Sequence, residues 1–104
     1  MTVQDRRLEL HNLLLSIMKN GNVYHQPPES KKLQYPCIVY ERDKGYEMHA
    51  DNSSYHRRLR YTITLIDKKS VSEFMDPIMD LPFCTYDRHF ANDDLNHDVF
   101  NLYF

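Results

Sequence analysis

The chain has 104 residues, of which 41% are hydrophobic and 27% are charged, and its formal net charge is −2. This composition predicts a single domain over residues 1–104 and excludes a largely disordered chain. The slightly acidic balance argues against a general affinity for nucleic acid, which a strongly basic domain would show. No apolar run reaches the roughly 20 residues of a membrane helix, so no membrane partner is expected.

The first predicted element is a helix over residues 4–19. Apolar residues recur there at helical spacing and form one stripe, which consists of Leu10, Leu13, Leu14, Ile17 and Met18. Thr2 is a candidate N-cap. Asn20 and Gly21 tolerate a positive φ, so we expect the helix to end there.

Two adjacent prolines follow a short extended piece at residues 22–26. Pro27 and Pro28 cannot donate backbone hydrogen bonds, so strand pairing should end and a stiff loop should begin at this point. After this loop, residues 37–41 are apolar enough for a central strand.

The longest predicted strand covers residues 55–67. One face of this strand is apolar and carries Leu59, Tyr61, Ile63 and Leu65, whereas the other face is polar and carries Arg58, Arg60, Thr62 and Thr64. This alternation is typical of a strand with one buried face.

A capping-box pattern from Ser70 to Glu73 predicts a second helix that continues to Leu81 and is kinked at Pro77. Residues 83–90 and 97–104 then read as two strands joined by a loop at 91–96. The predicted fold is therefore α+β. It has a mostly antiparallel sheet, an N-terminal helix and a second helix packed on one face, and a terminal β-hairpin.

The sequence offers no pattern for catalysis or for a cofactor. It lacks the motifs of common hydrolases and nucleotide-binding loops, so we expect neither an enzyme nor a cofactor. The six histidines do not show metal-ligand spacing. His89 and His97 could meet across the hairpin, where cross-strand polar pairing is the simpler interpretation. Cys37 and Cys84 are expected to be buried, reduced thiols.

Two clusters of opposite charge are separated along the chain. The basic cluster contains Arg57, Arg58 and Arg60, and the acidic cluster includes Asp93 and Asp94. Complementary patches of this kind suit a head-to-tail interface, which closes into a ring when the rotation permits. Two unrelated exposed surfaces are the alternative interpretation. A small nucleic-acid-binding domain is a further alternative, because arginines also fit phosphates.

Five segments in order resemble the tail completion or tail terminator family of long-tailed, siphovirus-type bacteriophages. These segments are NVYHQPPES, YPCIVYE, YTITLID, LPFCTYDRHF and LNHDVFNLYF, which together extend from residue 22 to the end. The sequence departs from the family pattern at Lys68-Lys69-Ser70 and at Pro77, where a regular amphipathic helix is expected.

The resemblance implies a structural protein of the virion, located in the neck region of the tail and made in the host bacterial cytoplasm. Such proteins form a ring, typically of six copies, on the last ring of the tail tube protein. The ring ends tube growth and presents a surface to the head connector or head-completion protein. DNA passes through its channel without sequence-specific binding. A head-tail joining protein of the neck is the alternative within the same class.

The loop at residues 26–34 is a candidate docking segment in such an assembly. Its proposed contact residues are Pro27, Pro28, Glu29, Lys31 and Lys32. A stiff loop loses little entropy when it docks, so it can bind a neighbouring subunit or tail ring cheaply. A plain surface loop is the alternative, because loops usually lie on the surface.

Overall fold

The structure, a computed structural model, describes residues 3–43 and 59–104. The five strands form one sheet, and the two helices accompany it, so the expected α+β fold with a mostly antiparallel sheet and a terminal hairpin is confirmed. In chain order the elements are α1 (Val3–Ile17), β1 (Val23–His25), β2 (Cys37–Arg42), β3 (Arg60–Asp67), α2 (Met75–Met79), β4 (Cys84–Asn92) and β5 (Leu95–Tyr103).

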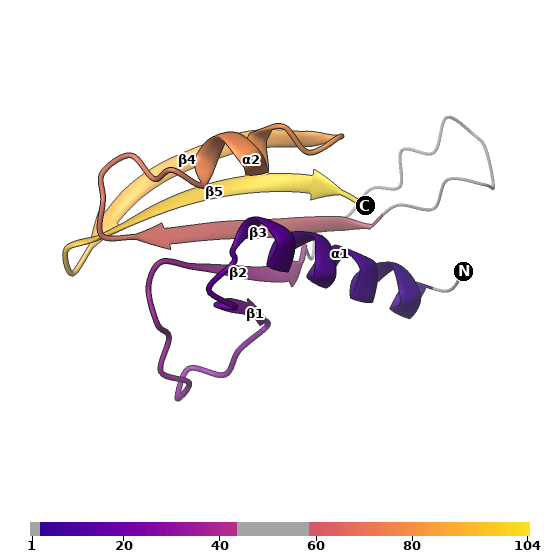
Figure 1. Ribbon diagram of the computed structural model, residues 1–104, viewed down its shortest axis with the longest axis horizontal. Coiled ribbons are helices and arrows are strands. Elements are labelled where there is room, and N and C mark those ends of the chain that lie inside the picture. The colour runs from indigo at the N-terminus through magenta and orange to yellow at the C-terminus, as the bar shows by residue number, and fades with distance from the viewer. Residues whose placement is uncertain (1–2, 44–58) are drawn as a thin grey trace.

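The strands lie in the order β1-β2-β3-β5-β4 (Figure 1). β1 pairs with β2 in parallel, and the other neighbouring pairs are antiparallel. The parallel pair needs a crossover connection, which the long loop between β1 and β2 provides. β1 and β4 are therefore the two edges of the sheet, and β3 is its central strand, with β2 and β5 on either side.

Both helices contribute to one core on a single face of the sheet, which we call the helix face. Side chains alternate along each strand, so Tyr61, Ile63 and Leu65 of β3 point to this face and are buried. Their partners on β5, Phe100 and Leu102, are buried with them. The helices complete this core by packing onto the same face, through Leu10, Leu14 and Met18 of the first helical segment and Ile78 of α2. The predicted alternation of this strand is confirmed from Leu59 onward.

The first helix follows its predicted stripe. Leu10, Leu14 and Met18 are fully buried, whereas Leu13 and Ile17 are partly buried at the margin of the core. α1 ends at Ile17, two residues before the predicted end at residue 19, and the chain then turns at Gly21, which has the expected positive φ of +83°. Asn20 then accepts a hydrogen bond from the Asn22 amide at 2.9 Å. The candidate cap Thr2 lies outside the described residues.

The second helix is shorter than predicted. It starts after Phe74 and has five residues. The capping box from Ser70 to Glu73 is wrong, because Ser72 caps the turn instead: its hydroxyl accepts from the Phe74 amide at 3.2 Å and donates to Asp67 at 2.8 Å. Pro77 does not kink a longer helix, since it lies in the first turn, where a missing amide proton costs nothing.

The terminal hairpin is tighter than predicted. The expected six-residue loop at 91–96 is reduced to a two-residue turn, because β4 continues to Asn92 and β5 begins at Leu95. Asp93 and Asp94 have φ values of 53° and 63°. Positive φ at both central positions is the requirement of a type I′ turn, whose twist matches that of the flanking strands.

The two cysteines are free thiols, as expected. Cys37 is buried, and Cys84 is only partly buried at the start of the edge strand. Burial raises the pKa of Cys37 to about 12, with a further contribution from the nearby Asp67 carboxylate. This thiol is therefore protonated at neutral pH and is inert as a nucleophile.

Candidate functional site

The edge strand β4 is the most exposed regular element of the described chain. It has nine residues, and every residue after Cys84 is exposed. β5 covers only one side of this strand, so its other side presents unpaired backbone groups. Tyr86 and Phe90 are among the large hydrophobic side chains that it exposes. A long exposed edge with aromatic residues is a template for pairing with another chain.

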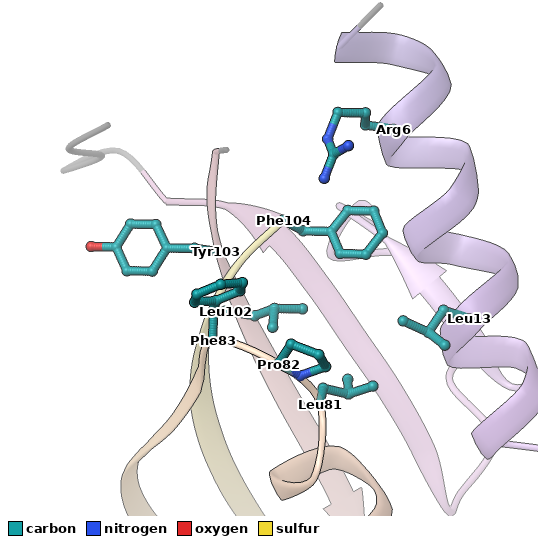
Figure 2. A pocket seen from close by; sticks show the side chains of 8 residues that line it. All are labelled: Arg6, Leu13, Leu81, Pro82, Phe83, Leu102, Tyr103 and Phe104. Carbon is teal, nitrogen blue, oxygen red and sulfur yellow. The ribbon is translucent and has the colours of Figure 1, made fainter. Parts of the chain in front are cut away.

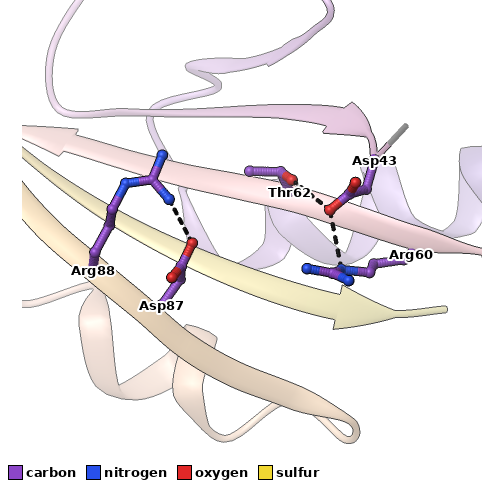
Figure 3. Close-up of polar contacts among 5 residues, drawn as sticks. All are labelled: Asp43, Arg60, Thr62, Asp87 and Arg88. Carbon is purple, nitrogen blue, oxygen red and sulfur yellow. Dashed lines mark hydrogen bonds and ion pairs between the residues drawn. The ribbon is translucent and has the colours of Figure 1, made fainter. Parts of the chain in front are cut away.

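A bulge and a pair of charges interrupt the middle of this edge. The register with β5 shifts between Tyr86 and Arg88, so Asp87 has no partner on β5. Arg88 and Asp87 form an exposed ion pair at 2.6 Å (Figure 3). Bulges and charges are devices that limit indiscriminate pairing of sheet edges. The bulge and the ion pair therefore restrict which strands can pair with β4.

A pocket of about 190 Å³ opens between α1 and the segment that leads into β4. Its apolar walls come from three elements, as Figure 2 shows, and the residues that line it are Arg6, Leu13, Leu81, Pro82, Phe83, Leu102, Tyr103 and Phe104. Pockets for drug-sized ligands usually measure about 300–1,000 Å³. This pocket is smaller, and its size suits a single side chain.

The margin of the pocket combines a cation with an exposed aromatic residue. The Arg6 guanidinium lies 5.0 Å from the centre of the Phe104 ring, and Figure 2 shows it at one edge of the pocket. Its Nε is buried without a hydrogen-bond partner. Phe83 is 60% exposed and has a φ of 62°, which is unusual for a bulky residue. Strained backbone of this kind tends to occur at functional sites.

The predicted basic cluster is described only at Arg60, because Arg57 and Arg58 lie outside the described residues. Arg60 Nε lies 3.0 Å from Asp43 Oδ2, which is close enough for an ion pair although the N–H direction does not complete a hydrogen bond. Thr62 donates to the same carboxylate oxygen at 3.4 Å (Figure 3). The charge of Arg60 is therefore already partly balanced within its own subunit.

The predicted acidic cluster lies at the far end of the sheet from Arg60. Asp93 and Asp94 form the turn between β4 and β5, whereas Arg60 faces Tyr103 near the last residues of β5. The structure therefore does not bring Arg60 and these two aspartates together within one subunit. A head-to-tail contact requires this separation, and the charge pairing itself stays a prediction.

The predicted docking loop is tied back to β1 of its own subunit. Tyr24 accepts a hydrogen bond from the Gln34 amide at 3.3 Å, and its ring lies 5.8 Å from the Lys31 ammonium nitrogen. The Lys31 amide also bonds to the Pro28 carbonyl at 2.9 Å. The loop is thus ordered by its own contacts. The side chains of four proposed contact residues, Pro28, Glu29, Lys31 and Lys32, are exposed, and Pro27 is partly buried.

A polar cluster joins α1 to β1 and β2 at the opposite edge of the sheet. The buried Tyr40 hydroxyl lies 2.7 Å from His11 Nδ1 and accepts a hydrogen bond from Arg7 at 3.3 Å. The His25 ring stacks obliquely on Tyr40, with the ring centres 4.8 Å apart. We call these four residues the tyrosine cluster. It fastens the short edge strand to the helix.

Burial and charge shift the proton affinities in the tyrosine cluster. Burial lowers the pKa of His11, and the Arg7 guanidinium lowers it further. The pKa of His25 is lowered for the same two reasons, with a smaller contribution from His11. Burial raises the pKa of Tyr40. Both imidazoles therefore prefer the neutral form, in which His11 Nδ1 can accept a hydrogen bond from the Tyr40 hydroxyl.

Metal and membrane features can be assessed only within residues 3–43 and 59–104. Across those ranges, no group of three or more potential metal ligands comes together. His89 instead contacts Asn96 at 3.0 Å, while His97 stacks on Phe90. Neither of the two helices in the same ranges is long and apolar enough to span a membrane.

Comparison with known proteins returns no matching family model, no matching curated protein and no matching solved structure. The five segments quoted in the sequence analysis map onto the sheet: each of them contains most or all of one of the five strands of the described chain.

Sequence reasoning did not single out the pocket or the exposed edge. Arg6 lies outside the predicted apolar stripe of the first helix, and Phe83 was predicted to be the first residue of a strand. A strand pattern reveals which side chains alternate, whereas edge position depends on the pairing order of the whole sheet. The adjacent Pro82 was the available signal, because proline often marks the point where a chain changes direction.

Proposed function

We propose that the chain is a structural subunit of a long-tailed bacteriophage. It forms a ring, typically of six copies, at the head-proximal end of the tail tube. The ring ends tube polymerisation and provides the surface to which the head joins. It acts through shape and charge complementarity and catalyses no reaction.

The observation that carries this proposal is the exposed edge strand β4. An edge of nine residues with exposed Tyr86 and Phe90 is costly to leave in water and favours association with another chain. The opposite edge is only three residues long and is fastened by the tyrosine cluster. The two edges thus differ, and a contact between unlike surfaces generates a ring or a filament rather than a closed pair.

The choice of a phage tail as the assembly rests on the resemblance to the tail terminator family. The five segments that resemble the tail terminator family include the long edge strand and the terminal strand beside it. The resemblance therefore concerns the elements that the proposal uses. Capping requires one face that binds the tube and another that a further tube subunit cannot bind.

Electron microscopy of particles made without this protein tests the proposal. We expect filled heads beside separate tails of uncontrolled length, because nothing would stop polymerisation. Tails of correct length that fail to attach to heads would favour the head-tail joining alternative. Normal virions would contradict both.

The contacts of Arg60 count against the alternative of a nucleic-acid-binding domain. Arg60 contacts Asp43, so part of the basic cluster is neutralised within the subunit. Binding to phosphates falls steeply as the salt concentration rises, because counterions are released. A duplex-DNA titration at two salt concentrations would restore this alternative if it showed tight, steeply salt-dependent binding.

A further inference from the structure

The loop between β3 and α2 presents an exposed aliphatic side chain. Val71 is 74% exposed, the largest fraction among the exposed large hydrophobic residues of the described chain. A single exposed valine needs no explanation by itself. Val71 is of interest because its loop is held by hydrogen bonds and because it lies far from the pocket of its own subunit.

Hydrogen bonds hold this loop against the end of the sheet. Asp67 Oδ1 accepts from the Lys69 amide at 3.1 Å, and its Oδ2 accepts from the Ser72 hydroxyl at 2.8 Å. Asn96 of β5 donates to the Lys68 carbonyl at 3.3 Å. Val71 is therefore presented on a pre-ordered loop, which reduces the entropy lost when it docks.

Val71 and the pocket lie at opposite ends of the sheet. Val71 follows the last residue of β3, whereas the pocket includes Leu102 and Phe104, which pair with the beginning of that strand. The eight residues of β3 span roughly 23 Å at about 3.3 Å per residue. One subunit therefore cannot place its own Val71 in its own pocket.

The Val71 loop and the pocket match in size and in charge. A cavity of about 150 Å³ is sufficient to hold benzene, so the pocket of about 190 Å³ accepts a branched aliphatic side chain. Glu73, two residues after Val71, is exposed, and Arg6 lies at the margin of the pocket. A carboxylate beside the apolar residue would thus meet a guanidinium at the pocket.

We infer that Val71 of one copy inserts into the pocket of the next copy, with Glu73 facing Arg6. This inference rests on the proposed function and names the contact by which the ring closes. It joins two different surfaces of the same chain, so each copy offers one of each and the contact repeats around an axis. No metal or cofactor is needed.

Charges of both signs lie at the Val71 end of the sheet. Lys68 and Lys69 lie in the same loop as Val71, and Asp93 and Asp94 lie in the turn at the same end of the sheet. Together with Glu73, the acids at this end outnumber the lysines. Charged groups at the rim of an interface set orientation and association rate more than affinity.

Photo-cross-linking tests the contact directly. A benzoylphenylalanine is placed at position 71, and labelled and unlabelled copies are mixed at high protein concentration so that links between copies are recognised by mass. We expect links between copies that map to residues 81–83 or 102–104. Absence of such links, or links that map elsewhere, would overturn the inference.

A charge exchange gives a second readout. Glu73→Arg or Arg6→Glu alone should lower the cross-link yield about tenfold, because like charges meet at the rim, and the double variant should recover most of it. Ser70→Asp is the matched control: it adds a charge to the same exposed loop without touching the proposed pair, and it should change the yield less than twofold. A double variant no better than the singles would contradict the pairing.

Virions assembled with a Val71 variant distinguish failure of this inference from failure of the proposed function. Val71→Asp should prevent ring closure and reproduce the tails of uncontrolled length, with the monomer still folded. Normal necks that contain the variant chain would reject the Val71 contact and leave the proposed function intact. A neck without any copy of the native chain would reject the function itself.

Discussion

The two edges of the sheet show contrasting ways of ending a sheet. β1 is short, and the tyrosine cluster fastens it to the first helix through Arg7, His11 and His25. β4 is three times as long and exposes nearly all its side chains. The first edge, which we call the covered edge because side chains of α1 contact it, contributes to the stability of the monomer. The second, the open edge, is available to a partner. If copies of the chain associate as proposed, we expect the open edge to take part in the contact.

Truncating Tyr40 of β2, the residue at the centre of the tyrosine cluster that fastens β1, should have the largest effect. Tyr40 is fully buried beneath α1, so Tyr40→Ala should lower the free energy of unfolding by about 3–5 kcal/mol. Denaturant titration measures this change. At the open edge, Phe90 is 41% exposed, and Phe90→Ala should cost less than about 1 kcal/mol of monomer stability. Equal losses at the two edges would contradict the comparison.

A partly buried hydrogen bond between the open edge and β5 should have an effect of intermediate size. Tyr86 donates a hydrogen bond at 2.9 Å to Asp98, whose carboxylate is buried in β5. Tyr86→Phe removes the donor and leaves the carboxylate without this partner, so we expect a loss of about 1–3 kcal/mol in unfolding free energy. Thr85→Val on the same exposed strand is the control and should be nearly neutral. A neutral Tyr86→Phe would show that the carboxylate is satisfied otherwise.

Acid should loosen the covered edge selectively. Because the pKa values of His11 and His25 are lowered in the folded state, the unfolded chain binds more protons as pH falls below about 6.5. Their contribution to stability is therefore complete above that value and declines below it, since protonation charges partly buried imidazoles and places new positive charge beside Arg7. Unfolding midpoints between pH 7.5 and 5.5 measure this decline.

Replacing both histidines separates this contribution from that of the carboxylates. The variant with His11→Gln and His25→Gln should lose stability less steeply over the same pH range than the native chain. Hydrogen exchange localises the effect, because amides of β1 should open in acid before those of β5. An unchanged slope in the double variant would show that the tyrosine cluster does not sense pH.

The smallest effect is expected at the surface ion pair of the open edge. Arg88 and Asp87 are adjacent and exposed, so Arg88→Ala should change monomer stability by less than about 1 kcal/mol. Its effect on association should be larger, since this pair lies in the middle of the proposed pairing edge. Sedimentation at several concentrations, together with a denaturant titration, measures the two effects separately.

The sequence predicts the centre of the sheet better than its margins. The alternation from Leu59 to Leu65 correctly identifies the buried face, because period-two patterning directly reflects a half-buried strand. Gly21 correctly predicts the end of the first helix, because its positive φ is a local requirement. These features depend on residues close together in the chain.

The margins depend on a choice between local alternatives and on the order of the strands. The capping box at Ser70 failed because Ser72 is instead bound to Asp67 of the neighbouring strand. Asp93 and Asp94 formed a tight turn because short acidic residues tolerate positive φ, an option that the loop prediction overlooked. The exposed edge and the pocket arise from strand order, which no local pattern encodes.

The central claim is that copies of this chain form a ring at the junction of head and tail. A cryo-electron microscopy reconstruction of the neck of intact virions tests it most directly. We predict a ring of this chain on the last tail-tube ring, with β4 and the Val71 loop of each copy against its neighbours. A well-resolved neck that contains no copy of the chain would contradict the claim.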